Sequence, residues 1–262
     1  MAARRRATAD GPGAFPRSGM GPCGPGSVTE ADVLVWTVRV DEEVDRLERL
    51  GALLAPGERE RAGRFHAERH RRQFVVTRGV LRTLIGRRLG IAPGLVRFVD
   101  GPHGKPALAD PSTPALEFNV AHSHGLALVA LSAGAPVGID VERIRPGVDH
   151  EGIAGRFLAQ VERTALARIE PARRVEAFFA CWSRKEAVLK AVGTGISGGL
   201  AAYAVSCDPD GPARLLATGP DGPSLDRWTL ADLDVGPGFR AAVAVAQPGA
   251  RIRQVDEDAG PR

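Results

Sequence analysis

Two carboxylates lie close together in a segment that the sequence predicts to be a strand. In residues 136–144 (PVGIDVERI) apolar and other side chains alternate, so Asp140 and Glu142 share one face, about 7 Å apart. Such a pair suits a divalent cation, because Mg²⁺ is commonly held by one or two carboxylates with waters and substrate phosphates completing its shell. The pair is also common on ordinary edge strands, where both groups are merely solvated.

A third carboxylate, Glu186, falls on the apolar stripe of a helix predicted over residues 171–196. Pro171 suits the first turn of this helix, and Gly193 suits its left-handed C-terminal position. A carboxylate on a core-facing stripe is costly unless it is paired or bound to a metal. Lys190 lies one turn further on, so an ordinary i,i+4 ion pair with Glu186 is the alternative to a metal site.

Several cationic side chains could bind an anion. A helix predicted from Pro56 to about Leu89 is heavily basic in its first half, which fits either an anion-binding face or a solvated face neutralised by glutamates. A Gly-Lys-Pro turn presents Lys105 on a stiff backbone. His122 and His124 sit at a strand end without an evident third His or Cys ligand, so a hydrogen bond to phosphate is favoured over zinc.

The composition is that of a soluble globular protein. The chain has 262 residues, 44% of them hydrophobic, and a formal net charge of +4, which allows an anionic partner without requiring one. No apolar run approaches the length of a membrane span. The three cysteines, Cys23, Cys181 and Cys207, have no metal-ligand spacing, and their odd number does not suggest a disulfide framework. We therefore expect a cytoplasmic protein that does not associate with a membrane.

The order of predicted elements indicates an α+β fold in two similar lobes. Residues 1–30, rich in Gly and Pro, are predicted to be a disordered N-terminal extension. An N-terminal lobe is expected over residues 31–134 and a C-terminal lobe over 135–247, followed by a loose tail at 248–262. The predicted strands are 32–38, 95–99, 116–120, 126–132, 136–144, 203–207, 214–218, 227–230 and 239–246, and the predicted helices are 41–54, 56–89, 150–169 and 171–196.

Four segments together resemble one family. They are GKPAL (104–108), FNVAHS (118–123), GIDVE (138–142) and WSRKEAVLKAVGTG (182–195). Their sequences and order are similar to those of the 4′-phosphopantetheinyl transferases, of the two-lobed type that activates surfactin synthetase and other carrier proteins. The resemblance runs from about Ala55 to Val245, and the ordered set is far more specific than any one motif. One departure is Ala121, where the family usually has Ser.

The resemblance implies a pseudo-dimeric fold, each lobe a small, mostly antiparallel sheet packed with a long helix, with the active site in the crevice between the lobes. It implies an enzyme that transfers phosphopantetheine from coenzyme A, bound by the N-terminal lobe, to a serine of an acyl, peptidyl or aryl carrier protein, releasing 3′,5′-ADP. Mg²⁺ would be the cofactor, with Mn²⁺ as an alternative, and a monomer is expected.

The resemblance also implies roles for particular residues. Asp140, Glu142 and Glu186 would hold the metal, with Asp140, Glu186 and Lys190 as the catalytic group. Glu186 would help to deprotonate the serine, and Trp182 would pack beneath the site. The coenzyme A contacts would come from Arg59, Lys105, His122, Lys185 and Lys190.

Two other functions remain as alternatives. One is a catalytically silent protein of the same fold that binds coenzyme A or a carrier protein; the retained acids argue against it. The other is a nucleic-acid binder built on the basic helix, but that helix lacks interleaved aromatic residues and any recognisable binding module. We therefore expect no nucleic-acid partner.

Overall fold

The computed structural model describes residues 32–40, 44–101, 105–109, 116–193, 195, 199–219, 222 and 224–256. The predicted disordered extension over residues 1–30 lies outside the described residues. The first half contains β1 (Asp32–Arg39), α1 (Val44–Ala52), α2 (Pro56–Gly63), α3 (Glu68–Leu89), β2 (Phe98–Asp100), β3 (Pro106–Leu108), β4 (Leu116–Ser123) and β5 (Leu126–Ala133). The second half contains β6 (Val137–Arg143), α4 (His150–Phe157), α5 (Gln160–Arg168), α6 (Arg174–Val192), β7 (Ala204–Val205), β8 (Leu215–Ala217), β9 (Thr229–Asp232), β10 (Phe239–Val245) and β11 (Arg251–Asp256).

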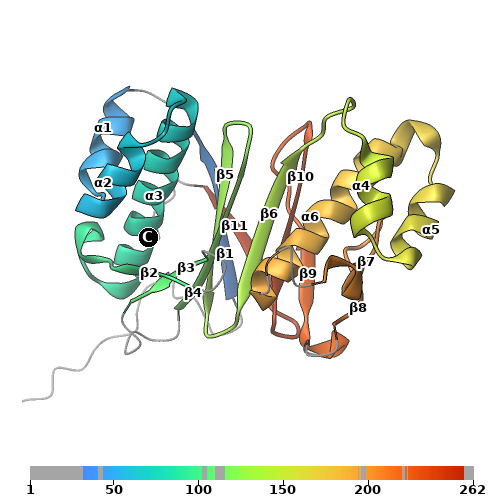
Figure 1. Cartoon of the computed structure of the whole chain (residues 1–262). Coiled ribbons are helices and arrows are strands. Elements are labelled where there is room, and N and C mark those ends of the chain that lie inside the picture. Colours follow the sequence, from blue (N-terminus) through green and yellow to red (C-terminus); the bar gives the residue numbers. More distant parts are fainter. Residues whose placement is uncertain are drawn as a thin grey trace, which may run out of the picture.

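Two sheets lie face to face between two sets of helices (Figure 1). The first sheet has the order β11-β1-β5-β4, the second has the order β6-β10-β9, and the pairs β1–β5, β5–β4, β6–β10 and β10–β9 are antiparallel. Helices α1 to α3 cover the outer face of the first sheet and α4 to α6 that of the second. The predicted α+β fold of two lobes, each a small sheet with one long helix, is confirmed.

Strand alternation builds this layered core. In β5, Leu126, Leu128 and Ala130 pack toward the second sheet, whereas the residues between them pack toward α3. In β6, Val137, Ile139 and Val141 fill the space between the sheets, as the alternating sequence predicts. The opposite face of β6 therefore turns toward α6.

Helix α6 crosses β6 at Gly138 with no room for a side chain. A Cβ atom at Gly138 would lie 2.0 Å from the carbonyl oxygen of Ala187 and 2.3 Å from the backbone nitrogen of Ala191. Only glycine allows this approach, because an added methyl group would have to displace helix backbone. The contact brings the C-terminal turns of α6 beside Asp140, the next residue on the same face of the strand.

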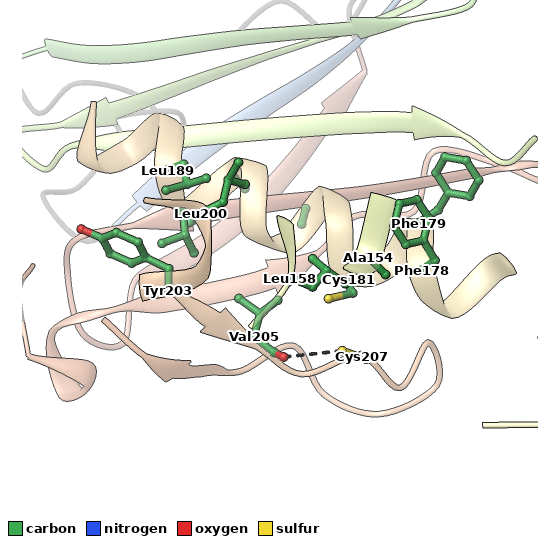
Figure 2. Close-up of a cluster of buried hydrophobic side chains, with 14 of the residues drawn as sticks. Ala154, Leu158, Phe178, Phe179, Cys181, Leu189, Leu200, Tyr203, Val205 and Cys207 are labelled. Atoms are coloured by element: carbon green, nitrogen blue, oxygen red, sulfur yellow. Dashed lines mark hydrogen bonds between the residues drawn. The ribbon is translucent and has the colours of Figure 1, made fainter. Parts of the chain in front are cut away.

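The face of α6 that turns away from β6 packs into a second apolar core (Figure 2). Phe178 and Phe179 pack there against each other with ring centroids 5.3 Å apart, and Leu189, Tyr203 and Val205 extend the cluster. Trp182 stacks on Phe178 at 5.8 Å, in agreement with its predicted packing role. This core fixes the position of α6 from the side opposite to β6.

Two predicted helices are interrupted in the structure. The helix predicted from residue 56 to 89 breaks after Gly63, since Ala67 is extended (φ −96°, ψ 125°) and Phe65 turns back to stack on Phe74 at 5.6 Å. The helix predicted over 150–169 ends at Phe157 and restarts at Gln160. There Glu162 accepts a hydrogen bond from the Ala159 N–H at 2.7 Å, which caps the new helix.

The third long helix is close to its prediction. Residues 171–173 form a short 3₁₀ turn, α6 follows to Val192, and Gly193 closes it with a φ of 82°, as predicted for this glycine. Among the described residues, no helix is long and apolar enough to cross a membrane.

The prediction of a loose C-terminal tail over residues 248–262 is wrong for residues 251–256. These residues form β11, which pairs in parallel with β1, so that Ile252 lies beside Val33 and Val255 beside Trp36. Backbone groups along the outer edge of β1 gain partners in this way. The last strand of the chain therefore completes the sheet of the N-terminal lobe, which the short, charged segment RIRQVD does not reveal.

We predict that Gly138→Ala lowers stability by about 1–3 kcal/mol, because the added methyl group must push α6 away from β6. Thermal denaturation measures the effect. The control is Gly155→Ala in α4, where a Cβ atom meets nothing within 4 Å; alanine there should stabilise the helix slightly. Equal melting temperatures for the two variants would contradict the close contact.

Candidate active site

The acidic side chains of β6 and the polar side chains of α6 meet at one place. Lys190 Nζ lies 2.6 Å from Asp140 Oδ1, and Glu186, 7% exposed, lies one helical turn before Lys190. The alternative of a simple Glu186–Lys190 ion pair is wrong, because Lys190 takes its partner from the neighbouring strand. Asp140, Glu186 and Lys190 thus lie close together, which is the arrangement that the resemblance implied.

Burial makes this group of carboxylates unusually basic. It raises the pKa of Asp140, although the Lys190 ammonium opposes the shift. The pKa of Glu186 is likewise raised by burial and by the charge of Asp140. Burial and the charge of Asp140 raise the pKa of Glu142 to about 7. Among the described residues, the lysine and arginine cations that act on this group are Lys190 and, on Glu142, Arg145, so the three carboxylates outnumber them.

The N-terminal lobe contributes to the same site. Ser123 Oγ, at the end of β4, lies 3.4 Å from Glu142 Oε2 and accepts a hydrogen bond from the Arg143 N–H at 3.2 Å. His122 is on the same strand end, where burial and the Lys190 ammonium lower its imidazole pKa. The site therefore lies where the two lobes meet.

The carboxylates fit a divalent cation in their chemistry. Asp140 Oδ2 and Glu186 Oε1 are both buried and lack a hydrogen-bond partner among the described residues. Two unsatisfied carboxylate oxygens in a site short of positive charge are the hard ligands that Mg²⁺ prefers. No group of three or more metal-ligating side chains is already arranged around a common point in the described part of the chain. The predicted set of Asp140, Glu142 and Glu186 is therefore not assembled in advance.

The predicted coenzyme A contact of Lys185 is wrong. Lys185 is 0% exposed and points away from Glu186, with its Nζ 2.8 Å from Glu162 Oε2, which is equally buried. The ammonium group also donates to the carbonyl oxygens of Leu200 and Tyr203. Adjacent residues of a helix point about 100° apart, so Lys185 lies in the core while Glu186, its neighbour in the motif, lies at the site.

The predicted contact of Lys105 with the nucleotide is also not supported. Its Nζ donates to the Lys190 carbonyl oxygen at 2.9 Å and to the Val137 carbonyl oxygen at 3.3 Å. The first of these belongs to the last turn of α6, whose unpaired carbonyl groups attract cations. Lys105 therefore ties the N-terminal lobe to the end of α6.

A cavity of about 610 Å³ opens beside the acidic group, on the N-terminal lobe. Its walls come from α2, α3, β2 and β4 and include Arg61, Phe74, Thr77, Arg78, Leu81, Asp100, Val120 and His122. Arg59, the predicted phosphate contact, is exposed and is not part of the wall. Arg61, two residues later on α2, lines the cavity in its place.

Sequence reasoning assigned no role to Ser123 or Asn119, and it placed the phosphate contact at Arg59 and not at its neighbour Arg61. Asn119 Oδ1 accepts a hydrogen bond from the Ile139 N–H at 2.9 Å, which joins β4 to β6 across the lobe boundary. The motif FNVAHS contains Asn119 and Ser123, so the signal was present without an assigned role. The sequence alone does not distinguish Arg59 from Arg61. They point in different directions from α2, and Arg61 is the one that lines the cavity.

The fold and the site define a two-lobed α+β enzyme with an acidic centre beside a basic cavity. Residues 41–134 match the family "4′-phosphopantetheinyl transferase, N-terminal", and residues 136–244 match the "4′-phosphopantetheinyl transferase superfamily". The chain is 38% identical over 216 residues to the 4′-phosphopantetheinyl transferase HetI of Nostoc sp., covering 82% of this chain and 88% of HetI. It is 28% identical to Sfp of Bacillus subtilis, covering 77% of this chain and 86% of Sfp, and 32% identical to psf-1 of Bacillus pumilus, covering 78% and 84%.

The chain therefore belongs to the 4′-phosphopantetheinyl transferase superfamily, and it is a transferase of the two-lobed type that Sfp represents.

We predict that Glu162→Ala destabilises the protein by about 3–5 kcal/mol, because it leaves the Lys185 ammonium buried without its counter-charge. Thermal denaturation tests this, with the exposed Glu48→Ala in α1 as the control. Unchanged stability of Glu162→Ala would contradict a structural role and return Lys185 to the candidate ligand-binding residues.

We predict that Glu142 makes the metal-free protein less stable as the pH rises. Its folded-state pKa of about 7 lies above the ordinary value of 4.5, so its favourable contribution is full below about 4.5 and is lost as the pH passes 7. Glu142→Gln should therefore flatten the dependence of melting temperature on pH in EDTA. Mg²⁺ should raise the melting temperature of the wild type more at pH 8 than at pH 6, because binding requires ionised carboxylates. Parallel pH profiles for wild type and variant would contradict the assignment.

Proposed function

We propose that this protein transfers the 4′-phosphopantetheine group of coenzyme A to a serine of an apo carrier protein, with Mg²⁺ or alternatively Mn²⁺ as cofactor. The proposal is carried by Asp140 and Glu186, whose buried oxygens Oδ2 and Oε1 lack partners among the described residues. Lys190 pairs with Asp140, and Ser123 of the cavity wall lies 3.4 Å from Glu142. An acidic centre that needs a cation, next to a cavity that needs an anion, suits a metal-bound pyrophosphate substrate.

The cavity would take the nucleotide end of coenzyme A. Its apolar wall, with Phe74, Leu81 and Val120, can pack against a purine ring, and its size is within the usual range for such ligands. Arg61 and His122 lie on the same wall and would meet the 3′-phosphate, with Arg61 taking the place first predicted for Arg59. The pyrophosphate would then extend toward Lys190 and the carboxylates.

The reaction moves one proton and exchanges one phosphate ester oxygen. The serine oxygen attacks the phosphorus that carries pantetheine, the bond to the bridging oxygen breaks, and 3′,5′-ADP leaves with the charge. Glu186 suits the role of proton acceptor because its pKa is raised and its Oε1 lacks a partner among the described residues. Lys190 would stabilise the charge that develops on the leaving phosphate.

Asp140, Glu142 and Glu186 would hold the metal. A bound divalent cation supplies Lewis-acid stabilisation of the phosphate oxygens. Ser123 would orient Glu142 toward the others through its contact with Oε2.

The protein partner would approach beside this centre. A second cavity of about 890 Å³ shares His70, Gln73 and His124 with the first, and its wall includes Glu68 besides Arg69, Arg72 and Arg143. Basic side chains there suit an acidic carrier protein. One chain supplies both lobes of the site, and Cys181 and Cys207 are free and buried, which supports a monomer in a reducing cytoplasm.

A catalytically silent protein of the same fold, which binds coenzyme A or a carrier protein, is the second candidate. It would keep the cavity without needing buried, unpaired carboxylates. The enzyme is favoured because burying charged groups costs free energy. The chain nevertheless holds several of them together, namely Asp140, Glu142, Glu186 and Lys190.

We predict that an apo carrier protein incubated with this chain, coenzyme A and Mg²⁺ gains about 340 Da by mass spectrometry, and that EDTA abolishes the gain. Glu186→Gln and Lys190→Met should each lower the rate by at least about 100-fold, since Glu186 would accept the proton and Lys190 would stabilise the leaving phosphate. Glu60→Gln, on an exposed side chain of α2, is the control. A wild type that binds coenzyme A but gives no gain with acyl, peptidyl or aryl carriers would favour the silent binding protein.

A further inference from the structure

The hairpin turn between β4 and β5 holds a histidine in the left-handed region of the backbone. Strand β4 ends at Ser123 and β5 begins at its pairing partner Leu126, so His124 and Gly125 form a two-residue turn. Both have a positive φ, 46° and 79°, which fits a type I′ turn, where Asn-Gly is the preferred pair. In the described part of the chain, His124 is the one residue other than glycine with a positive φ. The reason for a histidine at this position therefore lies in its side chain.

The side chain of His124 lies next to the acidic centre. It lines the first cavity and the second, so it stands on the boundary between them. Its Nδ1 lies 3.2 Å from Ser123 Oγ, and Ser123 Oγ lies 3.4 Å from Glu142 Oε2. A chain of two polar contacts therefore runs from the imidazole to a carboxylate of the acidic centre.

The hydrogen-bonding capacity of Ser123 decides which way this chain runs. A serine hydroxyl has one proton to donate and two lone pairs that accept. An ionised Glu142 can only accept, so it takes the hydroxyl proton. The Arg143 N–H donates to one lone pair at 3.2 Å. The contact with His124 is then a hydrogen bond only if Nδ1 carries a proton and donates it to the second lone pair.

The electrostatic surroundings of His124 make the position of its proton decisive. Burial and the charges of Arg145 and Arg143 lower the imidazole pKa of His124. At neutral pH the ring therefore has a single proton, which resides on Nδ1 or on Nε2. The hydrogen bond to Ser123 selects the Nδ1–H form, because only that form satisfies both lone pairs of the hydroxyl oxygen.

We propose that His124 is a positioning residue for the transfer reaction, whose Nδ1–H holds the Ser123 hydroxyl so that the hydroxyl holds Glu142 in the orientation a metal ion requires. This inference rests on the proposed function, in which Glu142 is a metal ligand. Hydrogen-bonded partners behind a ligand orient it and raise metal affinity. His124 acts in this way through Ser123 and does not itself contact the metal or the substrate.

The tautomer of His124 can be measured by ¹⁵N NMR of the metal-free protein at about pH 8, where the ring is neutral and Glu142 is ionised. Protonated and bare imidazole nitrogens have different chemical shifts, and comparison with His124→Asn assigns the signal among the six histidines. We expect the Nδ1–H form. Ser123→Ala should shift the ring to the Nε2–H form, which an unconstrained imidazole prefers. A wild type already in the Nε2–H form would overturn the proposal.

Magnesium affinity tests the consequence for the metal site. Calorimetric titration of Mg²⁺ into the coenzyme A complex, without a carrier protein, measures binding in the absence of transfer. His124→Gly suits the positive φ but removes the donor, so the melting temperature should change little while Mg²⁺ binds about two- to tenfold more weakly. His124→Asn should recover most of the affinity, because asparagine also suits the turn and its amide N–H stands as many bonds from the backbone as Nδ1.

A double variant tests the route through Ser123. Ser123→Ala alone should weaken Mg²⁺ binding by about 10- to 100-fold, since it removes the group that contacts Glu142. Adding His124→Gly to it should cost nothing more, whereas losses that add would contradict an action through Ser123. His66→Asn is the matched control, because His66 is exposed and lines neither cavity, and it should leave Mg²⁺ affinity unchanged.

Failure of this inference differs from failure of the proposed function. If the glycine and asparagine variants of His124 both bind Mg²⁺ as the wild type does, the inference is wrong while the proposed function stands. If the wild-type coenzyme A complex binds no Mg²⁺ and no carrier protein gains mass, the proposed function fails and this inference fails with it.

Discussion

The contact between α6 and β6 at Gly138 determines the geometry of the acidic centre. A Cβ atom at this position would lie 2.0 Å from the Ala187 carbonyl oxygen, so the backbones of the helix and the strand are in direct contact. This approach lets Lys190 reach Asp140 at 2.6 Å, across fifty residues of sequence. The rotation of α6 is fixed from its other side by Lys185, which is held by Glu162. Because adjacent residues point about 100° apart on a helix, anchoring Lys185 in the core directs Glu186 into the site.

Electrostatic imbalance on both sides of the lobe boundary follows from this placement. Burial raises the pKa values of Asp140, Glu142 and Glu186, and the charge of Asp140 adds to the shift at Glu142 and Glu186. The Lys190 ammonium opposes all three shifts, and Arg145 also opposes that of Glu142. The cavity wall has the opposite sign, since the guanidinium groups of Arg61 and Arg78 line it with one carboxylate, Asp100. A protein tolerates such unpaired groups only when the rest of the fold over-determines them, here through aromatic stacking and a buried helix. The same rigidity lets each group act on a ligand without reorganisation.

Much of the centre could be predicted from local patterns, because its carboxylates obey them. The two-residue period of β6 places Asp140 and Glu142 on the face away from the apolar core, and the period of α6 places Glu186 among buried residues. The partner of Lys190 could not be predicted from the sequence. The i,i+4 spacing favours Glu186, whereas the close packing of α6 on β6 at Gly138 places Asp140 next to the lysine. The strand at 251–256 escaped prediction because its stability comes from the edge of β1 and not from its own sequence.

Alignment between the two halves of the site depends on a few polar bonds across the lobe boundary. The side chain of Asn119 on β4 accepts a buried hydrogen bond from the Ile139 N–H of β6. Lys105, which directly precedes β3, donates a hydrogen bond to a carbonyl oxygen in the last turn of α6. Burial lowers the pKa of this lysine. Both bonds link backbone groups of the C-terminal lobe to side chains of the N-terminal lobe. A substrate that spans the basic cavity and the acidic centre needs their separation kept to a fraction of an ångström. The geometry of the centre therefore depends on Lys105 and Asn119 as well as on the carboxylates, because these two side chains join the lobes on either side of it.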